Sequence, residues 1–436
     1  MAHQMASRLA RDGHDVTVIC PFPNRPGGRL YPGFKRHLRR VEATGDGYKR
    51  VRCANWLLGK HRHPINRLLE NITFGLSAAW AAWREGRPDL FLVETWPLFA
   101  VTFTAVLAHC WRVPFLYYVK DIYPEAAERT GLIRSDSLVA RFCRLWDRYL
   151  CQSSAQVIVI SDSMRKLLTH GRKLRETQFT VIPDWQDAND FPPQPIESAW
   201  RREHGIPADA FVAMYGGTLG KVSGAEVLLE VAKLLRDRHD ILVICLGEGL
   251  LKQGMIDQCR SLGFDNIRFL PFQPRARLGE VQSSANVTLL TMRPGYPDAS
   301  VPSKLISYFA AGRPVISAVP KRSAVGEIVL ESGGGVVTNP GDARALALAL
   351  RALAASPGDA LRMGRAARAY FEKHFTLDRA HRQFTDLLKR AADSTGASPA
   401  FKCDIDVDDQ HSAEPLQSIG TLNCERVWQE GSSQRS

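Results

Sequence analysis

The chain has 436 residues, of which 45% are hydrophobic and 23% are charged, and its formal net charge is +12. This composition excludes an intrinsically disordered or collagen-like chain, and the length predicts two domains. The nine cysteines form no Cys-x-x-Cys pair, which argues against a zinc site and against a secreted disulfide scaffold. We interpret them as buried thiols in a reducing compartment.

The positive charge is concentrated in one segment of the first half. Between residues 35 and 63, nine Lys or Arg residues stand against two acidic residues. Such a segment is typical of a solvated surface or of a surface that contacts anionic lipid or a lipid-linked phosphate. The most apolar stretch, residues 95–110, is shorter than a membrane-spanning helix, and no signal peptide is visible. We therefore expect a cytoplasmic protein, with a peripheral membrane contact as a hypothesis.

Helices and strands alternate along the first half of the chain. The predicted elements are a helix at 5–11, strands at 15–20 and 89–94, a helix at 97–110, a strand at 114–119, a helix at 136–150, a strand at 155–160, a helix capped by Ser161, and a strand at 179–182. Because the chain opens on a helix that leads into a strand, we expect the first strand of this domain and its loop to be missing.

A second alternating series follows a proline-rich stretch. Its predicted strands are 211–215, 241–246, 267–270, 287–290, 315–318 and 335–337, and its predicted helices are 225–236, 250–262, 304–311, 343–355, 360–374 and 377–392. Alternation of this kind predicts the α/β class, with two doubly wound Rossmann-like domains facing a cleft. We place the first domain at 1–190, the linker at 191–208, the second domain at 209–392 and a disordered tail at 393–436.

The glycine-rich turn after strand 211–215 is the first candidate for a ligand site. No Gly-x-Gly-x-x-Gly and no Walker-type loop occurs, which argues against simple NAD or ATP binding. Gly216 and Gly217 would let the backbone approach a diphosphate, although a tight turn without a ligand explains the pair equally well.

The start of the helix at 304–311 is the second candidate. Ser303 and Lys304 open this helix just after a strand, and Arg293 lies a short loop away. A lysine on a first helical turn is unfavourable for the helix dipole unless an anion is bound there. The alternative is a solvated lysine, and we favour the anion site.

Several motifs together resemble the family 4 retaining glycosyltransferases, in the branch of bacterial O-antigen and capsule sugar transferases. The motifs are VPSK at 301–304 with Tyr308 and GRPV at 312–315, YGG at 215–217, LGEG at 246–249, IPDW at 182–185, KDIYPE at 120–125 and TGLI at 130–133. The resemblance covers about residues 1–390 and implies the two-domain GT-B architecture.

The resemblance also implies a nucleotide-sugar donor site, and a UDP-sugar is the donor we expect. The diphosphate would contact Gly216, Gly217, Arg293, Ser303 and Lys304, the base would lie near Phe272 and Gln273, the ribose would lie near Ser307, and Asp121 would contact the acceptor or the sugar as the candidate catalytic residue. The acceptor implied is a glycan or a polyprenyl-diphosphate-linked glycan. We expect no cofactor, no metal and no nucleic-acid partner.

The chain departs from the family pattern at several positions. Ala299 and Ser307 stand where the family commonly has two Glu residues, and Lys120 stands where it often has His. Thr218 and Ser223 replace the family's frequent Arg and Lys after the glycine turn. A non-catalytic paralogue acting as a scaffold is therefore an alternative. A UDP-sugar epimerase is another, although its candidate histidines fall in helix or linker contexts at His109, His170, His204 and His239.

Overall fold

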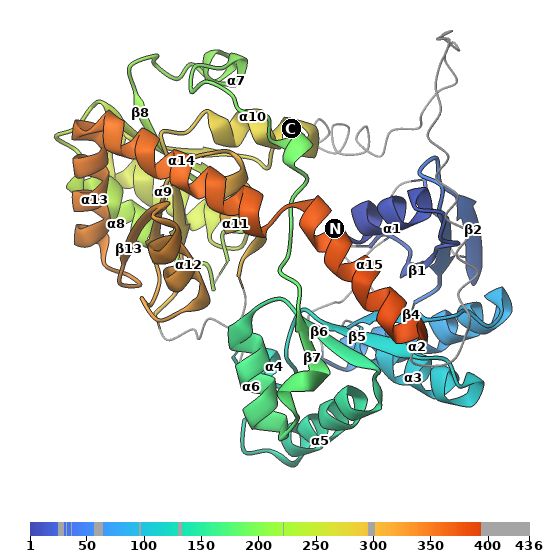
Figure 1. The fold of residues 1–436 in the computed structure, drawn as a ribbon. Coiled ribbons are helices and arrows are strands. Elements are labelled where there is room, and N and C mark those ends of the chain that lie inside the picture. Colours follow the sequence, from blue (N-terminus) through green and yellow to red (C-terminus); the bar gives the residue numbers. More distant parts are fainter. Residues whose placement is uncertain are drawn as a thin grey trace, which may run out of the picture.

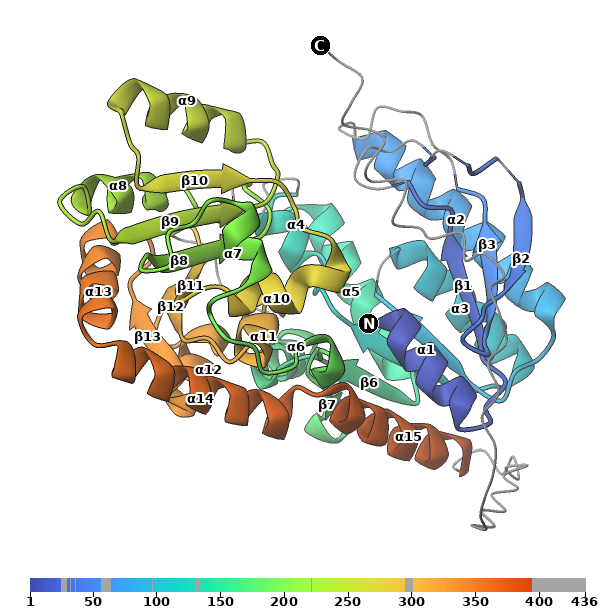
Figure 2. The same cartoon turned by 90° about the horizontal axis from the view of Figure 1, so that it is seen from above.

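The computed structural model describes residues 1–24, 30–31, 33–35, 37–55, 64–95, 97–129, 133–220, 222–294 and 301–393. Residues 394–436 of the predicted tail, the 130–132 part of the TGLI motif and Ala299 lie outside this range. The described chain forms two groups of strands and helices, which are joined by the segment after β7 and by the C-terminal helix (Figures 1 and 2).

The second half forms a six-stranded parallel sheet. Its strands are β8 (Phe211–Gly216), β9 (Ile241–Leu246), β10 (Ile267–Leu270), β11 (Val287–Thr291), β12 (Val315–Ala318) and β13 (Gly335–Thr338). The spatial order is β10-β9-β8-β11-β12-β13, which is the 3-2-1-4-5-6 order of a Rossmann fold. Every residue of β9 is buried, as expected for a strand covered on both faces.

Helices follow these strands and cover the sheet. They are α8 (Val227–Leu234), α9 (Lys252–Leu262), α10 (Leu278–Ser283), α11 (Ser303–Ala310), α12 (Ala324–Ser332), α13 (Ala343–Ala355) and α14 (Pro357–His374). Apolar side chains of α8 and α13 lie in one core cluster with β8 and β9, whereas those of α11 and α12 lie in another. Helix α14 contributes Ala360 to the first cluster and Phe371 to the second. Two apolar cores on one sheet are what the alternating sequence predicts.

The first half contains two sheets. β1 (Thr17–Pro21) pairs in parallel with β3 (Lys49–Cys53), which pairs antiparallel with β2 (Arg39–Ala43). A four-stranded parallel sheet contains β4 (Phe91–Glu94), β5 (Phe115–Val119), β6 (Gln156–Val159) and β7 (Phe179–Val181) in that order. The accompanying helices are α1 (Ala2–Arg11), α2 (Pro64–Glu85), α3 (Leu98–Trp111), α4 (Glu125–Arg129), α5 (Leu138–Ser153) and α6 (Asp162–Arg172).

The predicted α/β class with two Rossmann-like units is confirmed, and most predicted strands are found within two residues of their expected limits. The Ser161 cap is also confirmed, because its side chain accepts a hydrogen bond from the Met164 amide. The prediction omitted the strands β2 and β3 and the helices α2, α4, α10 and α12. β2 and β3 are rich in arginine and carry no apolar run, so no local pattern indicates a strand there.

Ion pairs neutralise part of the predicted basic segment. Glu42 lies within 3.0 to 3.7 Å of three arginines, Arg40, Arg50 and Arg52. Glu85 at the end of α2 contacts both Arg39 and Lys49. The β2–β3 hairpin therefore uses much of its positive charge internally, and a membrane contact by this segment stays a hypothesis.

The helix α15 (Leu377–Asp393) returns from the second half and packs on the first (Figure 2). Phe384 is fully buried there, with ring centroids 5.5 Å from Tyr118 and 5.8 Å from Trp185. Arg8 of α1 pairs with Asp378 at 2.9 Å. These contacts bind the C-terminal helix to the core of the first half.

We predict that Phe384→Leu lowers the free energy of unfolding by about 1–2 kcal/mol, because leucine loses both edge-to-face contacts and leaves space unfilled. Urea denaturation followed by circular dichroism would measure the change. Leu361→Ala is the control, since Leu361 is 52% exposed on α14 and its removal should cost less than about 0.5 kcal/mol. Equal effects of the two substitutions would contradict this account of α15.

The segment predicted as a linker contains a short helix, α7 (Ala199–Glu203). Ser198 caps it, and Trp200 is fully buried in a cluster with Val212 of β8 and Ile244 of β9. The end of the proline-rich stretch therefore packs with the second sheet. The exact domain boundaries stay a prediction.

Among the helices described, none combines the length and apolar character of a membrane span. The described cysteines form no disulfide, and Cys53, Cys151, Cys245 and Cys259 are buried as expected. Cys110 is exposed, so the prediction of buried thiols is wrong for that residue.

Candidate functional site

The residues predicted for diphosphate binding gather where the strand order of the second sheet reverses. Gly216 and Gly217 follow β8, and Arg293 follows its neighbour β11. The Gly216 amide donates to the Tyr308 hydroxyl of α11 at 2.8 Å, which holds this helix against the end of β8. Lys304 lies on the first turn of the same helix. Ligands of doubly wound sheets bind at such a position, beyond the carboxyl ends of the strands.

Two glycine-containing loops stack on one another at this edge. A Cβ on Gly247 would lie 1.9 Å from the Gly217 carbonyl oxygen, and one on Gly249 would lie 2.3 Å from the Leu219 carbonyl oxygen. The Leu219 amide also donates to the Glu248 carbonyl at 2.9 Å. Gly247 has φ 154° and Gly249 has φ 156°, which side chains disfavour. Only glycine allows the two loops to approach this closely.

We predict that Gly247→Ala separates these loops, lowers the free energy of unfolding by about 2–3 kcal/mol and weakens nucleotide binding. Thermal unfolding and calorimetric titration would measure the two effects. Gly254→Ala is a matched control on α9, where a Cβ has no neighbour within 4 Å. That variant should be stabilised by about 0.5–1 kcal/mol, since alanine favours a helix. The interpretation fails if the two variants behave alike.

Lys304 is a cation without an anionic partner among the described residues. Its ammonium lies 4.5 Å from the centroid of the Tyr215 ring and close to Gly217. Burial of the group lowers its pKa to about 8, and no carboxylate offsets that effect. Part of the side-chain surface nevertheless stays open to solvent. A desolvated ammonium with no carboxylate partner among the described residues is suited to receive a phosphate.

The start of α11 offers further donors to an anion. Pro302 is the residue before the helix and provides no side-chain cap, and Ser303 is exposed. No acidic residue occupies the first turn. The helix dipole therefore points its positive end, together with Lys304, toward the same edge of the sheet.

The Arg293 loop is held against the loop after β8. The Arg293 amide donates to the Val222 carbonyl at 3.2 Å, and a Cβ on Gly224 would lie 2.6 Å from the Met292 carbonyl carbon. The Arg293 side chain is exposed. The backbone contacts thus place this arginine at the same edge as the glycine turn.

The residues predicted for the base lie after β10, two strands away from the reversal point. Phe272 is 44% exposed, and Gln273 accepts a hydrogen bond from the Trp200 indole at 3.0 Å. Ser307 is buried, where it accepts from Gln282 at 3.0 Å and donates to the Lys304 carbonyl at 3.0 Å. The hydroxyl of Ser307 is therefore already bonded within the protein, and its contact with a ribose stays a prediction.

Asp121 lies in the first half, where the chain leaves β5, and its side chain is exposed. A buried arginine supports the loop that follows. Arg172 donates to the Tyr123 carbonyl and to Glu125, each at 2.8 Å, and to Asp147 at 2.7 Å. Burial raises the pKa of Asp147 to about 6 despite Arg172. Burial also acts to raise the pKa of Glu125. The hydrogen bonds and the charge of Arg172 outweigh this effect, so the pKa of Glu125 is lowered overall.

Lys120 also has a defined position beside Asp121. Its ammonium lies 3.1 Å from Asp184 and stacks over Tyr118 and Trp185, with centroid distances of 4.9 and 5.8 Å. The motifs KDIYPE and IPDW, which are distant in sequence, therefore meet in one cluster. Sequence reasoning did not identify Arg172 or Asp147, because a charged residue within a helix is ordinarily solvated.

The four histidines weighed for an epimerase lie on separate elements. They are His109 on α3, His170 on α6, His204 after α7 and His239 before β9. His204 stacks on Trp200, with the ring centroids 4.5 Å apart, and His170 contacts the Lys166 carbonyl. None of them follows β8 or β11, and the geometry gives an epimerase no support.

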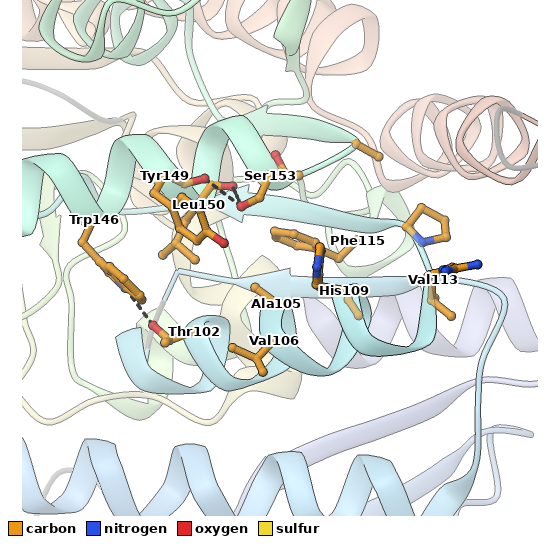
Figure 3. A pocket seen from close by; sticks show the side chains of 15 residues that line it. Thr102, Ala105, Val106, His109, Val113, Phe115, Trp146, Tyr149, Leu150 and Ser153 are labelled. Carbon is orange, nitrogen blue, oxygen red and sulfur yellow. Dashed lines mark hydrogen bonds between the residues drawn. The ribbon is translucent and has the colours of Figure 1, made fainter.

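Within the described part of the chain, no three His, Cys, Asp or Glu residues gather as metal ligands would. The expectation of a metal-free reaction stays a prediction. A cavity of about 810 Å³ opens between α3 and α5 of the first half, and none of the donor-site candidates lines it (Figure 3).

Comparison with known proteins agrees with this arrangement of the chain. The family described as glycosyl transferase 4-like domain matches residues 1–185, and the family described as glycosyl transferases group 1 matches residues 197–370. An Escherichia coli K12 protein, WcaI, named as a putative colanic acid biosynthesis glycosyl transferase, is 24% identical over 88% of this chain and 94% of its own length.

Solved structures share the fold. Sucrose-phosphate synthase from Thermosynechococcus elongatus superimposes with a TM-score of 0.71 at 18% identity, covering 90% of this chain and 93% of that protein. Anabaena HepE in complex with UDP-glucose superimposes with a TM-score of 0.60 at 20% identity, covering 75% and 84%.

Proposed function

Because the chain belongs to the family 4 glycosyltransferases, we propose that it transfers a sugar, with retention of configuration, from a UDP-sugar to a glycan or polyprenyl-diphosphate-linked acceptor in surface polysaccharide biosynthesis. The observation that carries the donor part is Lys304, a cation with no acidic partner among the described residues, which lies beside the glycine turn and on the first turn of α11. The UDP-glucose complex of HepE and the colanic acid role in the name of WcaI support the donor and the pathway class.

Transfer of a sugar from a UDP-sugar requires that the leaving diphosphate be stabilised. Negative charge grows on the diphosphate as the bond to the sugar breaks, and donors fixed in advance stabilise it without reorganising. Lys304, the amides that open α11 and the exposed Arg293 are the donors that lie at this edge. Gly216 and Gly217 leave room for the phosphates to approach the backbone.

Asp121 is our candidate for contact with the acceptor or the transferred sugar. Arg172 holds the loop after it through Tyr123 and Glu125. This arrangement would let the first half bring the acceptor hydroxyl to the sugar held by the second half, which is the positioning that a transfer reaction needs.

Calorimetric titration of the purified chain with UDP and with GDP tests the donor proposal. We expect UDP to bind more tightly than GDP. Incubation with UDP-sugars and a lipid-linked glycan acceptor, followed by NMR of the product, tests retention through the anomeric configuration. Binding of neither nucleotide by folded protein would refute the donor site, and an inverted anomer would refute retention.

A non-catalytic role stays the second candidate, because Ser307 stands where the family commonly has a Glu. Its hydroxyl already accepts a hydrogen bond from Gln282 and donates one to the Lys304 carbonyl. A chain of this kind would bind UDP but release no product with any acceptor. The two titrations above, read together with the product assay, separate it from the transferase.

A further inference from the structure

The helix α5 carries an apolar stripe on its outer side. Leu138, Phe142, Leu145 and Tyr149 recur at intervals of four, three and four residues, and they are between 55% and 79% exposed. The opposite side of the helix is buried against the core. A surface helix ordinarily presents polar residues outward, so this second apolar face has no partner among the described residues.

The stripe continues into the groove between α3 and α5. Trp146 lies between Phe142 and Tyr149, with ring centroids 6.2 and 5.5 Å away, and its indole donates to Thr102 of α3 at 2.9 Å. The cavity of about 810 Å³ lies beside these rings, and Val106 of α3 lines it and is exposed (Figure 3). Aromatic and aliphatic groups of both helices thus form one face, which we call the α3–α5 face.

The charges carried by α3 and α5 themselves are mostly positive, while Asp136 before α5 pairs with Arg134. The sequences of α3 and α5 contain one acidic residue, Asp147, and Arg172 already binds it in the interior. Arg141 and Arg148 flank the stripe, and Arg112 follows α3 at one end of the groove. No carboxylate in the described residues pairs with these three arginines.

We propose that the α3–α5 face docks on an anionic phospholipid bilayer, with the α5 stripe in the acyl–headgroup boundary and the three arginines on lipid phosphates. An amphipathic helix with aromatic and aliphatic residues on its apolar face and arginines beside that face is suited to that boundary. A second copy of the chain is a poorer occupant, because a two-fold interface would place Arg141 and Arg148 against like charges. The proposal does not rest on the donor site.

Flotation of the purified full chain with lipid vesicles tests the docking. We expect binding to vesicles of phosphatidylcholine mixed with phosphatidylglycerol, weak binding to phosphatidylcholine alone, and release by high salt. Phe142→Glu with Leu145→Glu should weaken binding about tenfold or more, and both residues are exposed enough for the fold to tolerate the change. Arg141→Gln with Arg148→Gln should weaken it by about fivefold per arginine.

Leu348→Glu is the matched control, since Leu348 is 67% exposed on α13 in the second half and should leave flotation unchanged. A Lys304→Met variant should float like the parent chain, which keeps this test separate from the donor site. The proposal is overturned if the parent chain does not bind anionic vesicles, or if the variant with Phe142→Glu and Leu145→Glu floats with them as well as the parent chain does. Sedimentation that shows a dimer dispersed by the same two substitutions would also overturn it, because the face would then bind a second copy.

Discussion

Replacing Lys304 by methionine is expected to weaken UDP binding by about 10- to 100-fold while making the unliganded protein more stable. The loss follows from one charge-assisted bond to phosphate, which contributes about 1.5–3 kcal/mol. The gain follows from the lowered pKa of Lys304, because holding a proton on a desolvated ammonium opposes folding at neutral pH. Function and stability therefore change in opposite directions at this residue.

The contribution of Lys304 to the free energy of unfolding should depend on pH, and the shift in its pKa fixes the direction of that dependence. The pKa of Lys304 is about 8 in the folded chain, below the ordinary lysine value of 10.5. Between these values the unfolded chain binds more protons, so the parent protein gains stability from Lys304 as pH rises through this window. Below it the cost is on the order of 2–3 kcal/mol, allowing for the open part of the side chain. Methionine removes that cost.

Urea denaturation between pH 7 and pH 10, with UDP titrations at pH 7, would measure both effects. The difference in stability between variant and parent should be largest at pH 7 and shrink toward pH 10. Lys233→Met on α8 is the control, since that lysine is 60% exposed and pairs with Glu230 at the surface. A Lys304 variant that binds UDP normally would remove the main support for the donor site.

The sequence predicts those parts of the fold whose signals are local. Strand β9 is a run of six apolar residues between polar ends, and its limits agree with the prediction. Lys304 could be singled out because a cation on a first helical turn conflicts with the dipole, a conflict that is readable within a few residues. The glycine turn after β8 could also be identified locally, because two adjacent glycines directly follow a predicted strand.

Other features depend on partners that the local sequence does not reveal. The arginines of β2 and β3 meet Glu42 and Glu85, and Val51 and Cys53 of β3 pack with Phe74. Both Phe74 and Glu85 come from α2, more than twenty residues later in the chain. Arg172 looks like a solvated residue at the end of α6 until the fold places Asp147 and Glu125 beside it. Single-sequence patterns contain no information on such pairings.

The role of Arg172 leads to the second large effect. We expect Arg172→Met to lower the free energy of unfolding by about 3–5 kcal/mol, because it leaves the buried Asp147 without its cation and leaves the partly buried Glu125 with Arg144 alone, at 3.4 Å. Chains that still fold should bind UDP normally but transfer sugar more slowly, since Arg172 holds the Tyr123 carbonyl in the loop after Asp121.

The same variant should show an altered pH dependence. Burial already raises the pKa of Asp147 to about 6 with Arg172 present, and loss of the arginine would raise it further. A carboxyl whose folded pKa lies above its unfolded value makes the folded state bind the extra proton, so the variant should lose stability as pH rises from 5 to 8. The parent chain should lose much less over pH 6 to 8, since its Asp147 is largely ionised above pH 6.

Urea denaturation at pH 5.5 and pH 8 would test this, with the double variant Arg172→Met, Asp147→Asn as the matched comparison. The introduced asparagine would still accept the hydrogen bond that the Tyr117 hydroxyl gives to Asp147 at 3.2 Å, but it carries no charge to bury. If the single variant suffers from an unpaired carboxylate, the double variant should recover part of the stability and lose the pH dependence. If instead the two variants are equally unstable at both pH values, the loss comes from packing around Arg172, and the explanation by an unpaired Asp147 carboxylate is wrong.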